Sequence, residues 1–576
     1  MKKRLSKIIA IILCVFALSA TLTGCGKGGS GELKRDEKTI NVRAVIGGYG
    51  DSWLRKLAAQ FNKTYAEQGY KVNVLASATD LSSDVAMKEL YSKDDWADVY
   101  FVTVNNTMAR FTASRGEYGQ LVADLTDTVW NKPAINFEGK EESGKLISEK
   151  ARVKLPDDVL KVDGRVYGFN TSNDIGGMIV NMKKLAKYGI TEVPKTTKEL
   201  FDAFELIYLG DADKGIKGSL ESRIYPITYL GGDNGYPIHF VTTWQAQYSG
   251  IDEYNRFYGY YDEEGNDMLE DGYTVYNSVA LEKMLEAMYN MYDASFVALG
   301  SANNTISSAH MKLMTDLGGA VFMADGNWAY NEIVTDYSDR MEDLAFANVP
   351  VLSAVGTKLF AKYGFNEEQC EEILAYTIRK ADDGKTTDEI YDLFSAEKGE
   401  LFATITNKET FKQDIEEVLK ARGLYCSRSS LAAGALISEK SKNKEICYLF
   451  LRMFASDDNA VLYNRECNGF TAYMSDFSQA KSTAYNKECQ AIVENAYATP
   501  VWMNSTGLRL RMGHNNQIFP GEDLSFVSKI IDRRATIYDK GVKKGQPIVY
   551  TNEALSMINK VRENAKNNWS KWTSKL

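Results

Sequence analysis

The sequence predicts an α/β fold, because segments with the pattern of strands alternate with segments with the pattern of helices. The first block runs from residue 39 to residue 102 and reads as strand, helix, strand, helix, strand. A second block begins near Asp163, and a further strand–helix pair covers residues 432–455. Strands that alternate with helices form a parallel sheet that the helices cover. We therefore expect at least two α/β units.

The first block is recognised by a change in hydrophobic period. Residues 39–46 alternate β-forming residues, whereas Leu54 and Phe61 belong to an apolar face with helical spacing. The remaining elements are a strand, a short helix and a strand at residues 71–75, 84–91 and 97–102. Ligands of parallel sheets bind at the carboxyl ends of strands, which here are the loops at residues 47–49 and 103–106.

The second block contains both strand and helix signals. A turn at residues 163–165 precedes short strands, and Thr196 with Glu199 forms a capping box that opens a helix. Residues 319–323 predict another strand. Residues 354–425 differ in character, since they carry a succession of helix signals, and we interpret them as a helical insertion.

The composition disfavours several functional classes. The chain has 3 histidines among 576 residues, which weakens a metalloenzyme or histidine-based catalytic interpretation. Its net charge of −9 argues against nucleic acid, which binds basic surfaces. No Cys/His spacing of a zinc site occurs, so neither a metal nor a cofactor is expected. The 34 tyrosines, 24 phenylalanines and 8 tryptophans are a surplus that needs an explanation.

The N-terminus carries the features of a lipoprotein signal. Basic residues precede an apolar run at residues 8–20, which is too short to span a bilayer comfortably. The sequence Leu-Thr-Gly-Cys at residues 22–25 resembles the bacterial lipobox, whose cysteine receives a diacylglycerol. Residues 1–24 are then a lipoprotein signal peptide, and Cys25 is the lipidation site. Residues 25–38 are rich in Gly, Ser and charge and predict a flexible tether. An ordinary secretory signal with an incidental cysteine is the alternative.

The other cysteines do not form a metal motif. Beyond Cys25 the chain has five cysteines, an odd number. Their spacing leaves open either one disulfide or buried free thiols. The residues are Cys370, Cys426, Cys447, Cys467 and Cys489.

Three ordered segments together resemble the extracellular solute-binding proteins of the sugar-binding type (family 1), the lipoprotein receptor components of ABC importers. The segments are DGRVYGF at residues 163–169 with the stretch 178–200, GGAVFMADGNW at 318–328, and AGALI at 433–437 with SKNKE at 441–445. No single motif is specific, but their order and the lipobox agree with the family. The resemblance covers most of residues 39–510.

The resemblance implies a periplasmic-binding-protein-like α/β fold, with two α/β lobes around a hinge and ligand cleft. We expect residues 39–172 and 350–465 in lobe 1, including the helical insertion 354–425. Lobe 2 is then expected to contain residues 173–349 and 466–576.

The function implied is capture of a carbohydrate, most simply an oligosaccharide, by lobe closure and delivery to ABC transporter permease subunits. The protein is expected to be a monomer without enzymatic activity, held by its lipid at the outer face of the cytoplasmic membrane.

Candidate ligand-binding residues follow from sugar chemistry. Aromatic rings cover the apolar faces of sugars, while Asp, Asn and Glu bond the hydroxyls. Trp328 matches the ligand-stacking tryptophan of the family, with Asn327 and Tyr330 close to it in sequence. The other aromatic candidates are Tyr49, Tyr236, Trp244, Tyr473 and Trp502. The polar candidates are Asn105, Asn106, Asn173, Asp174 and Asp233. Core packing is the alternative for the aromatic residues, and Asx turns or helix caps for the polar ones.

Two other functions stay open at this point. A peptide or other polar solute fits the same fold, since the fold does not name the ligand. A surface glycoside hydrolase needs two carboxylates about 5–9 Å apart across a cleft. Ligand size is also open, because Val180 replaces the aromatic residue usual in the family pattern and the insertion 354–425 is larger than usual.

Overall fold

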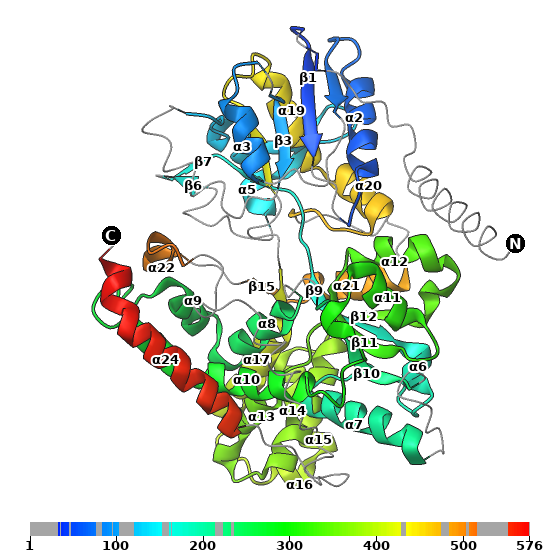
Figure 1. Ribbon diagram of the computed structural model, residues 1–576, viewed down its shortest axis with the longest axis vertical. Coiled ribbons are helices and arrows are strands. Elements are labelled where there is room, and N and C mark those ends of the chain that lie inside the picture. The colour runs from blue at the N-terminus through cyan, green and yellow to red at the C-terminus, as the bar shows by residue number, and fades with distance from the viewer. Residues whose placement is uncertain are drawn as a thin grey trace, which may run out of the picture.

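A computed structural model describes the two lobes and most of the connections between them (Figure 1). The described residues are 33–34, 36–44, 48–75, 83–94, 96–102, 120–151, 161–162, 164–213, 223–231, 236–427, 434–473, 483–502, 506–514, 551–574 and 576. The predicted signal peptide, Cys25 and most of the tether lie outside them. No helix in these ranges combines the length and apolar character needed to cross a membrane.

The first lobe is built on a five-stranded sheet with the order β2-β1-β3-β14-β8. Its strands are β1 (Thr39–Ala44), β2 (Lys71–Val74), β3 (Val99–Val102), β8 (Phe169–Asn170) and β14 (Gly434–Ile437). β1 runs parallel to β2 and β3, whereas β14 is antiparallel to β3 with Leu436 opposite Tyr100. The strand–helix alternation predicted for residues 39–102 is confirmed, with ends that differ by up to two residues.

Helices cover this sheet and share one apolar core with it. They are α2 (Ser52–Thr64), α3 (Ser83–Tyr91), α5 (Ile147–Lys150), α19 (Lys444–Phe454) and α20 (Asp457–Cys467). On α2, Leu54 and Phe61 are buried, and the ring of Phe61 packs edge-on against Phe450 of α19 at 5.5 Å. Two hairpins and a π-helix complete the lobe: β4 (Pro133–Ile135), β5 (Glu141–Leu146), β6 (Lys161–Val162), β7 (Arg165–Val166) and η1 (Thr126–Trp130).

The second lobe has a mixed six-stranded sheet. Its strands are β9 (Gly176–Asn181), β10 (Tyr225–Thr228), β11 (Ala320–Gly326), β12 (Leu344–Ala347), β13 (Leu424–Cys426) and β15 (Thr499–Val501). β9 is the central strand, because it pairs antiparallel with β11 along one edge and with β12 and β13 along the other. Every residue of β9 and β11 is buried, as expected for strands covered on both faces.

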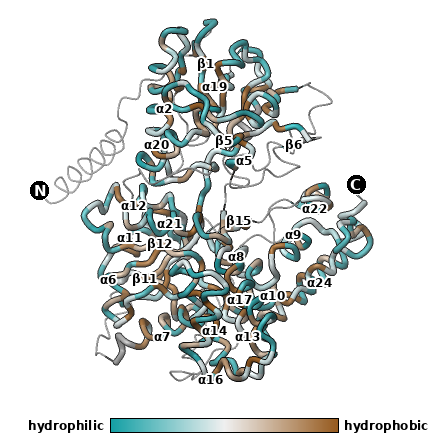
Figure 2. Tube along the Cα trace, turned by 180° about the vertical axis from the view of Figure 1, so that it is seen from behind, coloured by the Kyte–Doolittle hydropathy of each residue, from teal (hydrophilic) through white to brown (hydrophobic). Residues whose placement is uncertain are grey.

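Many helices surround the second sheet, and each lobe has its own apolar interior (Figure 2). They are α6 (Met182–Ala186), α7 (Thr197–Asp213), α8 (Ile238–Ser249), α9 (Ile251–Gly259), α10 (Val279–Met291), α11 (Ile306–Met314), α12 (Ala329–Tyr337), α21 (Ala484–Glu494), α22 (Gly507–Arg511) and α24 (Thr551–Thr573). Short 3-10 turns also occur here: η2 (Gly272–Asn277), η3 (Ser301–Asn303) and η4 (Ser338–Asp343).

The helical insertion belongs to the second lobe, so its expected assignment to lobe 1 was wrong. Its elements are α13 (Ser353–Phe360), η5 (Ala361–Tyr363), α14 (Glu367–Asp382), α15 (Thr387–Glu397), α16 (Gly399–Phe402) and α17 (Lys408–Gly423). They share an apolar core with α8 and β11 and lie at the end of the second lobe that is remote from the first (Figure 1). An amphipathic pattern shows that a helix buries one face, but not which lobe covers it.

Among the described residues, two extended segments of the hinge lie side by side. The backbone N–H of Asn173 donates to the Phe470 carbonyl at 2.8 Å, and the N–H of Ala472 donates to the Thr171 carbonyl at 3.2 Å. Tyr473 still packs in the core of the first lobe. The expected lobe boundary at residue 466 therefore needs correction, because Phe470 packs with residues of the second lobe whereas Tyr473, farther along the chain, still packs in the first.

All five cysteines in the described part of the chain are buried, and none of the five is joined to another by a disulfide. The disulfide left open by their spacing is absent from this structure, and the thiols behave as small apolar groups in the cores.

Candidate functional site

The two lobes meet at the loop that follows the first strand. Tyr49 lies there, and its hydroxyl oxygen is 3.0 Å from Asp174 Oδ1 and 3.0 Å from Asn327 Oδ1. Asp174 belongs to the hinge segment, and Asn327 follows the end of β11 in the second lobe. Tyr49 packs against the apolar cores of both lobes. One residue of the first lobe thus joins the hinge and the second lobe.

Asn327 is held in place by a reciprocal pair of hydrogen bonds with the hinge. The backbone N–H of Ile175 donates to Asn327 Oδ1 at 3.0 Å, and the backbone N–H of Asn327 donates to the Ile175 carbonyl at 2.9 Å. Because Oδ1 accepts from a backbone N–H, the orientation of the side-chain amide is determined. The amide nitrogen Nδ2 is fully buried and has no hydrogen-bond partner within the described ranges.

Trp328 lies beneath the loop of the first lobe. Its side chain is only 7% exposed, and its ring lies 6.1 Å from that of Tyr236 and 6.0 Å from that of His239. A Cβ atom at Gly48 would lie 3.0 Å from Trp328 Cδ1 and 2.7 Å from Glu332 Oε1. The loop approaches this closely because residue 48 has no side chain.

A group of titratable residues adjoins Trp328. His310 Nε2 lies 2.9 Å from Asp325 Oδ2 and 3.9 Å from Glu332 Oε2. Burial raises the pKa of Glu332 to about 7, and the nearby charge of Asp325 adds to this effect. Burial would lower the pKa of His310, but the hydrogen bond and charge of Asp325 outweigh it, so the pKa rises. Both shifts favour the protonated forms of Glu332 and His310, which lie near the contact between the lobes.

A second polar contact joins the lobes beside the hinge. Asn331 Nδ2 donates to the Cys467 carbonyl at the end of α20, and Asn468 Nδ2 donates to Asn331 Oδ1 at 3.2 Å. Together with the Tyr49 contacts, these bonds hold the lobes against one another in this conformation.

The structure brings together four of the predicted ligand-binding residues: Tyr49, Asp174, Tyr236 and Trp328. Asn327, which the sequence suggested only through its position beside Trp328, completes the group. Asn105, Asn106 and Asp233 lie outside the described residues.

The other predicted residues lie elsewhere. Asn173 Nδ2 donates to the Tyr425 hydroxyl at 3.1 Å, so this side chain faces β13. Trp244 is fully buried in the second lobe, where its Nε1 donates to the Pro350 carbonyl at 2.9 Å. The Tyr473 hydroxyl donates to the Asn170 carbonyl at 2.9 Å, beside the hinge. Trp502 is partly buried and packs against the cores of both lobes, and the ring of Tyr330 packs at a tilt of 52° against that of Tyr485.

Three residues at this place were not singled out as site residues from the sequence. They are Gly48, His310 and Glu332. Glu332 follows Trp328 by one helical turn, and that spacing is the sequence signal that could have pointed to it. His310 is isolated in sequence, and only the packing of α11 against α12 places it here.

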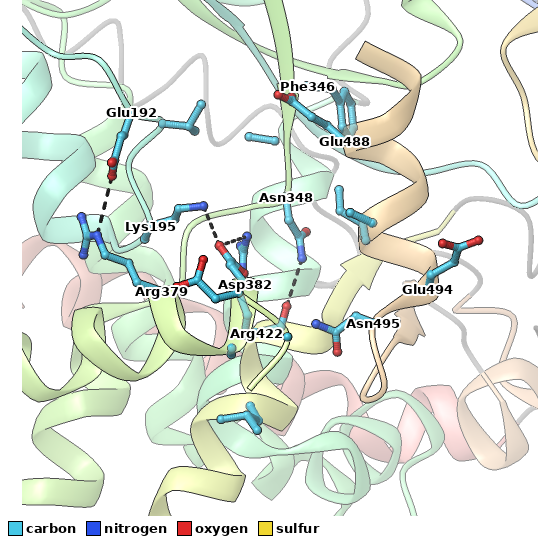
Figure 3. A pocket seen from close by; sticks show the side chains of 18 of the residues that line it. Glu192, Lys195, Phe346, Asn348, Arg379, Asp382, Arg422, Glu488, Glu494 and Asn495 are labelled. Atoms are coloured by element: carbon cyan, nitrogen blue, oxygen red, sulfur yellow. Dashed lines mark hydrogen bonds and ion pairs between the residues drawn. The ribbon is translucent and has the colours of Figure 1, made fainter. Parts of the chain in front are cut away.

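A separate cavity of about 900 Å³ lies between the helical insertion and the body of the second lobe (Figure 3). Its walls come from the loop before α7, from β12, from the ends of α14 and α17, and from α21. The Asp382 carboxylate binds Lys195 Nζ at 2.5 Å and Arg422 Nε at 2.8 Å on one wall. On another wall, burial raises the pKa of Glu488 to about 6. No sequence motif pointed to this cavity.

The described residues include no group of three or more His, Cys, Asp or Glu side chains arranged to hold a metal ion.

Comparison with known proteins identifies the fold. No family model matches the sequence, and no curated protein matches it. Among solved structures, a chitin oligosaccharide binding protein is similar with a TM-score of 0.51 and 13% identity, over 92% of this chain and 99% of the other. The solute-binding protein RafE in complex with raffinose is similar with a TM-score of 0.51 and 12% identity, over 92% of this chain and 99% of the other. A probable secreted solute-binding lipoprotein from Streptomyces coelicolor is similar with a TM-score of 0.52 and 14% identity, over 87% of this chain and 98% of the other. This chain therefore has the two-lobed α/β fold of the solute-binding proteins of ABC importers.

Proposed function

We propose that this chain is a receptor that captures a carbohydrate, most simply an oligosaccharide, between its lobes and delivers it to the permease subunits of an ABC transporter. The observation that carries the proposal is the meeting of Trp328 and Tyr236 with Asp174 and Asn327 where the lobes touch. These residues come from the hinge and from the second lobe, so a ligand bound there would be enclosed by closure of the first lobe.

The chemistry of these groups suits a sugar. An indole or phenol ring covers an apolar C–H face, and carboxylate and amide oxygens accept hydrogen bonds from hydroxyls. Asn327 and Trp328 are consecutive, so a polar and an aromatic contact are offered side by side. The names of similar structures include chitin oligosaccharide and raffinose, which supports a carbohydrate ligand over a peptide.

Lobe closure supplies the capture mechanism. A hinge of extended segments allows the lobes to move as rigid bodies, and a ligand shifts the equilibrium only through contacts that it makes in the closed form. The hydrogen bonds of Tyr49 and Asn331 across the lobes are weak enough individually, about 1 kcal/mol each, to be exchanged for ligand contacts.

The location and the anchor rest on the sequence. Cleavage before Cys25 and lipidation of that residue would place the receptor at the outer face of the cytoplasmic membrane, where a monomer can meet a permease. Labelling with a radioactive fatty acid tests the anchor, and a Cys25→Ser variant should lose the label and the membrane fraction.

A calorimetric screen tests the ligand class. We expect at least one of cellotetraose, maltotetraose, xylotetraose and raffinose to bind, and Trp328→Ala to weaken that binding at least about tenfold, since a buried aromatic contact is worth more than 1.4 kcal/mol. Trp572→Ala, on α24, is the matched control and should bind like the wild type. Equal binding by the Trp328 variant would disprove the site, and binding of peptides alone would disprove the carbohydrate class.

Enzymatic activity is tested on the same samples. New reducing ends after incubation with the oligosaccharides would indicate a glycoside hydrolase instead of a receptor.

A further inference from the structure

The cavity beside Asp382 lies between the helical insertion and the body of the second lobe (Figure 3). None of its lining residues is among those that join the lobes at Tyr49 or Asn331. Its volume of about 900 Å³ falls within the range of small-molecule sites in proteins, about 300–1,000 Å³. The cavity is therefore large enough for a small organic ligand and is separate from the contact between the lobes.

The basic side chains that line this cavity already have acidic partners. Each of the four lies within hydrogen-bond distance of a carboxylate. The pairs are Lys195 and Arg422 with Asp382, Arg379 with Glu199, and Lys385 with Glu389. An anionic ligand would have to break one of these pairs before it gained a positive partner, so the cavity does not favour an anion.

Three acidic side chains of the walls are in a different situation. Within the described ranges, no Lys or Arg nitrogen lies within 4.0 Å of the carboxylates of Asp383, Glu488 and Glu494. Glu494 accepts a hydrogen bond from Gln490 Nε2 at 2.8 Å, and Glu488 accepts one from a backbone N–H of β12. The charges of the cavity that are not paired are therefore negative.

Glu488 combines an accessible carboxylate with an altered acidity. Its side chain extends from α21 towards β12 and is partly open to the cavity that it lines (Figure 3). Burial by the surrounding walls raises the pKa of Glu488 to about 6, and the Phe346 N–H and the charge of Lys195 reduce this effect without cancelling it. A recessed carboxylate of this kind gains a favourable interaction from any cation that reaches it.

Apolar side chains lie beside this carboxylate. Ile492 follows Glu488 by one turn of α21, so the two side chains share a face of the helix. Val193 and Tyr497 line the cavity as well, and all three apolar residues are only partly buried. Their exposed surface would be covered by the hydrocarbon part of a ligand whose charged group meets Glu488.

We propose that this cavity is a separate ligand site for a small organic amine, bound in its ammonium form, and that Glu488 pairs with the ammonium group. The site does not depend on the proposed carbohydrate function. Because its walls come from both the insertion and the body of the second lobe, a bound amine contacts both and stabilises their junction. The insertion thus completes one wall of a ligand site.

Calorimetry on the full-length protein with butylamine and 2-phenylethylamine tests the ligand class. We expect at least one amine to bind with a dissociation constant below about 10 mM and to raise the melting temperature as its concentration rises. The matching alcohol, butan-1-ol or 2-phenylethanol, should bind at least about tenfold more weakly, because it lacks the charge. Absence of saturable binding by both amines, or equal binding of the alcohol, would overturn the proposal.

Variants locate the bound amine. Glu488→Gln keeps the size of the side chain and an acceptor for the Phe346 N–H, and should weaken the amine at least about tenfold. Ala491→Lys places an ammonium three residues from Glu488 at an exposed position of the wall, where it should compete with the ligand. Ala491→Gln and Glu445→Gln, the latter exposed on α19 of the first lobe, should bind like the wild type. Wild-type affinity in both Glu488→Gln and Ala491→Lys would overturn the role of Glu488.

Trp328→Ala separates this site from the contact between the lobes. It should bind the amine like the wild type, and loss of amine binding in this variant would place the amine between the lobes and overturn the separate site. Sugar binding should in turn be unchanged by Glu488→Gln. Failure of the amine to bind would therefore leave the proposed carbohydrate function intact.

The pH dependence of amine binding gives an independent check. The affinity should fall as the pH falls through about 6, because a protonated Glu488 no longer pairs with an ammonium group that keeps its charge. The other charged side chains that face it across the cavity or lie beside it are Lys195, Arg379, Asp382, Asp383, Arg422 and Glu494. Burial would raise the pKa of Asp382, but Arg422 and Lys195 outweigh it and lower the pKa, so Asp382 stays charged near pH 6. Glu488→Gln should lose the pH dependence, and equal wild-type affinity at about pH 5 and pH 8 would overturn the proposal.

Discussion

The hydroxyl of Tyr49, in the loop after the first strand, lies 3.0 Å from the carboxylate of Asp174 in the hinge, although 125 positions separate the two residues. This contact joins the first lobe to the hinge. Because the same hydroxyl also meets Asn327, one side chain connects the first lobe, the hinge and the end of β11. The conformation of the lobes is therefore sensitive to small changes in this loop.

Gly48→Val should hold the lobes apart. The new side chain would clash with Glu332 and Trp328, where a Cβ alone would lie within 2.7 Å and 3.0 Å of their nearest atoms. Small-angle scattering should show a larger radius of gyration, while the melting temperature changes little because each lobe keeps its core. Gly399→Ala is the control, since no described atom lies within 4 Å of a Cβ there. A compact Gly48→Val protein would disprove the contact.

The free energy of unfolding should fall as pH rises from about 5 to 8, because of titratable groups near Trp328. The pKa of Glu332 is raised to about 7, so the folded state holds a proton that the unfolded state has released, and this contribution is lost above pH 7. The raised pKa of His310 acts in the same direction, under the influence of Asp325, Glu332 and Asp336.

Urea unfolding at pH 6 and pH 8 measures this effect. Between pH 6 and pH 8, the free energy of unfolding of the wild type should fall by about 1–2 kcal/mol more than that of Glu332→Gln. This figure allows for partial solvent screening of the carboxyl. Asp339→Asn, an exposed change on η4, should behave like the wild type. An identical pH dependence in Glu332→Gln and the wild type would contradict the prediction.

Asp382→Asn should loosen the junction between the insertion and the second lobe. The carboxylate bonds Lys195 before α7 and Arg422 at the end of α17, and its loss should lower the free energy of unfolding by about 1–3 kcal/mol. Burial would raise the pKa of Asp382, but Arg422 and Lys195 outweigh it and lower the pKa. Its contribution is therefore present at neutral pH and lost in acid, as the pH falls through the lowered pKa.

Unfolding of Asp382→Asn at pH 7 and pH 3 checks both statements. The difference from the wild type should be larger at pH 7 than at pH 3, because protonation removes the bridge as the pH falls. Asp388→Asn serves as the control, because its side chain is 78% exposed and its bond to Lys412 is a surface ion pair worth less than about 1 kcal/mol. Equal losses in the two variants would show that the Asp382 bridge does not stabilise the junction.

Arg509→Ala should release the C-terminal part of the second lobe. This arginine is fully buried, its Nη2 donates to the Tyr276 hydroxyl at 2.6 Å, and its guanidinium lies 4.6 Å from the ring centre of Tyr260. Loss of the cation–π contacts, the hydrogen bond and the packing should cost about 3 kcal/mol in unfolding free energy. Arg511→Ala, two residues on and largely exposed, should cost under about 0.5 kcal/mol, and similar costs for both would refute the prediction.

Local pattern predicted the elements well. The strands expected at residues 39–46, 71–75 and 97–102 are β1, β2 and β3, and the helix expected after Thr196 is α7, where the Glu199 backbone N–H donates to Thr196 Oγ1 at 3.2 Å. These features depend on hydrophobic period and cap chemistry within a few residues, which a sequence displays directly. Trp328 was predicted from its match to the family pattern, and ligand contact by Trp328 and Asp174 stays a prediction.

Other features depend on contacts between distant segments. The insertion was expected in lobe 1, yet its helices bury their apolar faces on α8 of the second lobe, a choice that the faces themselves do not encode. The cavity beside Asp382 is likewise formed by six separate segments, each of them ordinary in sequence.

The sequence by itself determined that this chain is an α/β protein, and it placed aromatic and polar side chains at the ends of its strands. Only the tertiary structure decided that Tyr49, Asp174 and Asn327 share one point between the lobes. The reason is physical: hydrophobic period acts over a few residues, whereas a hydrogen bond is directional and short. Whether these three side chains meet therefore depends on how both lobes pack at the hinge.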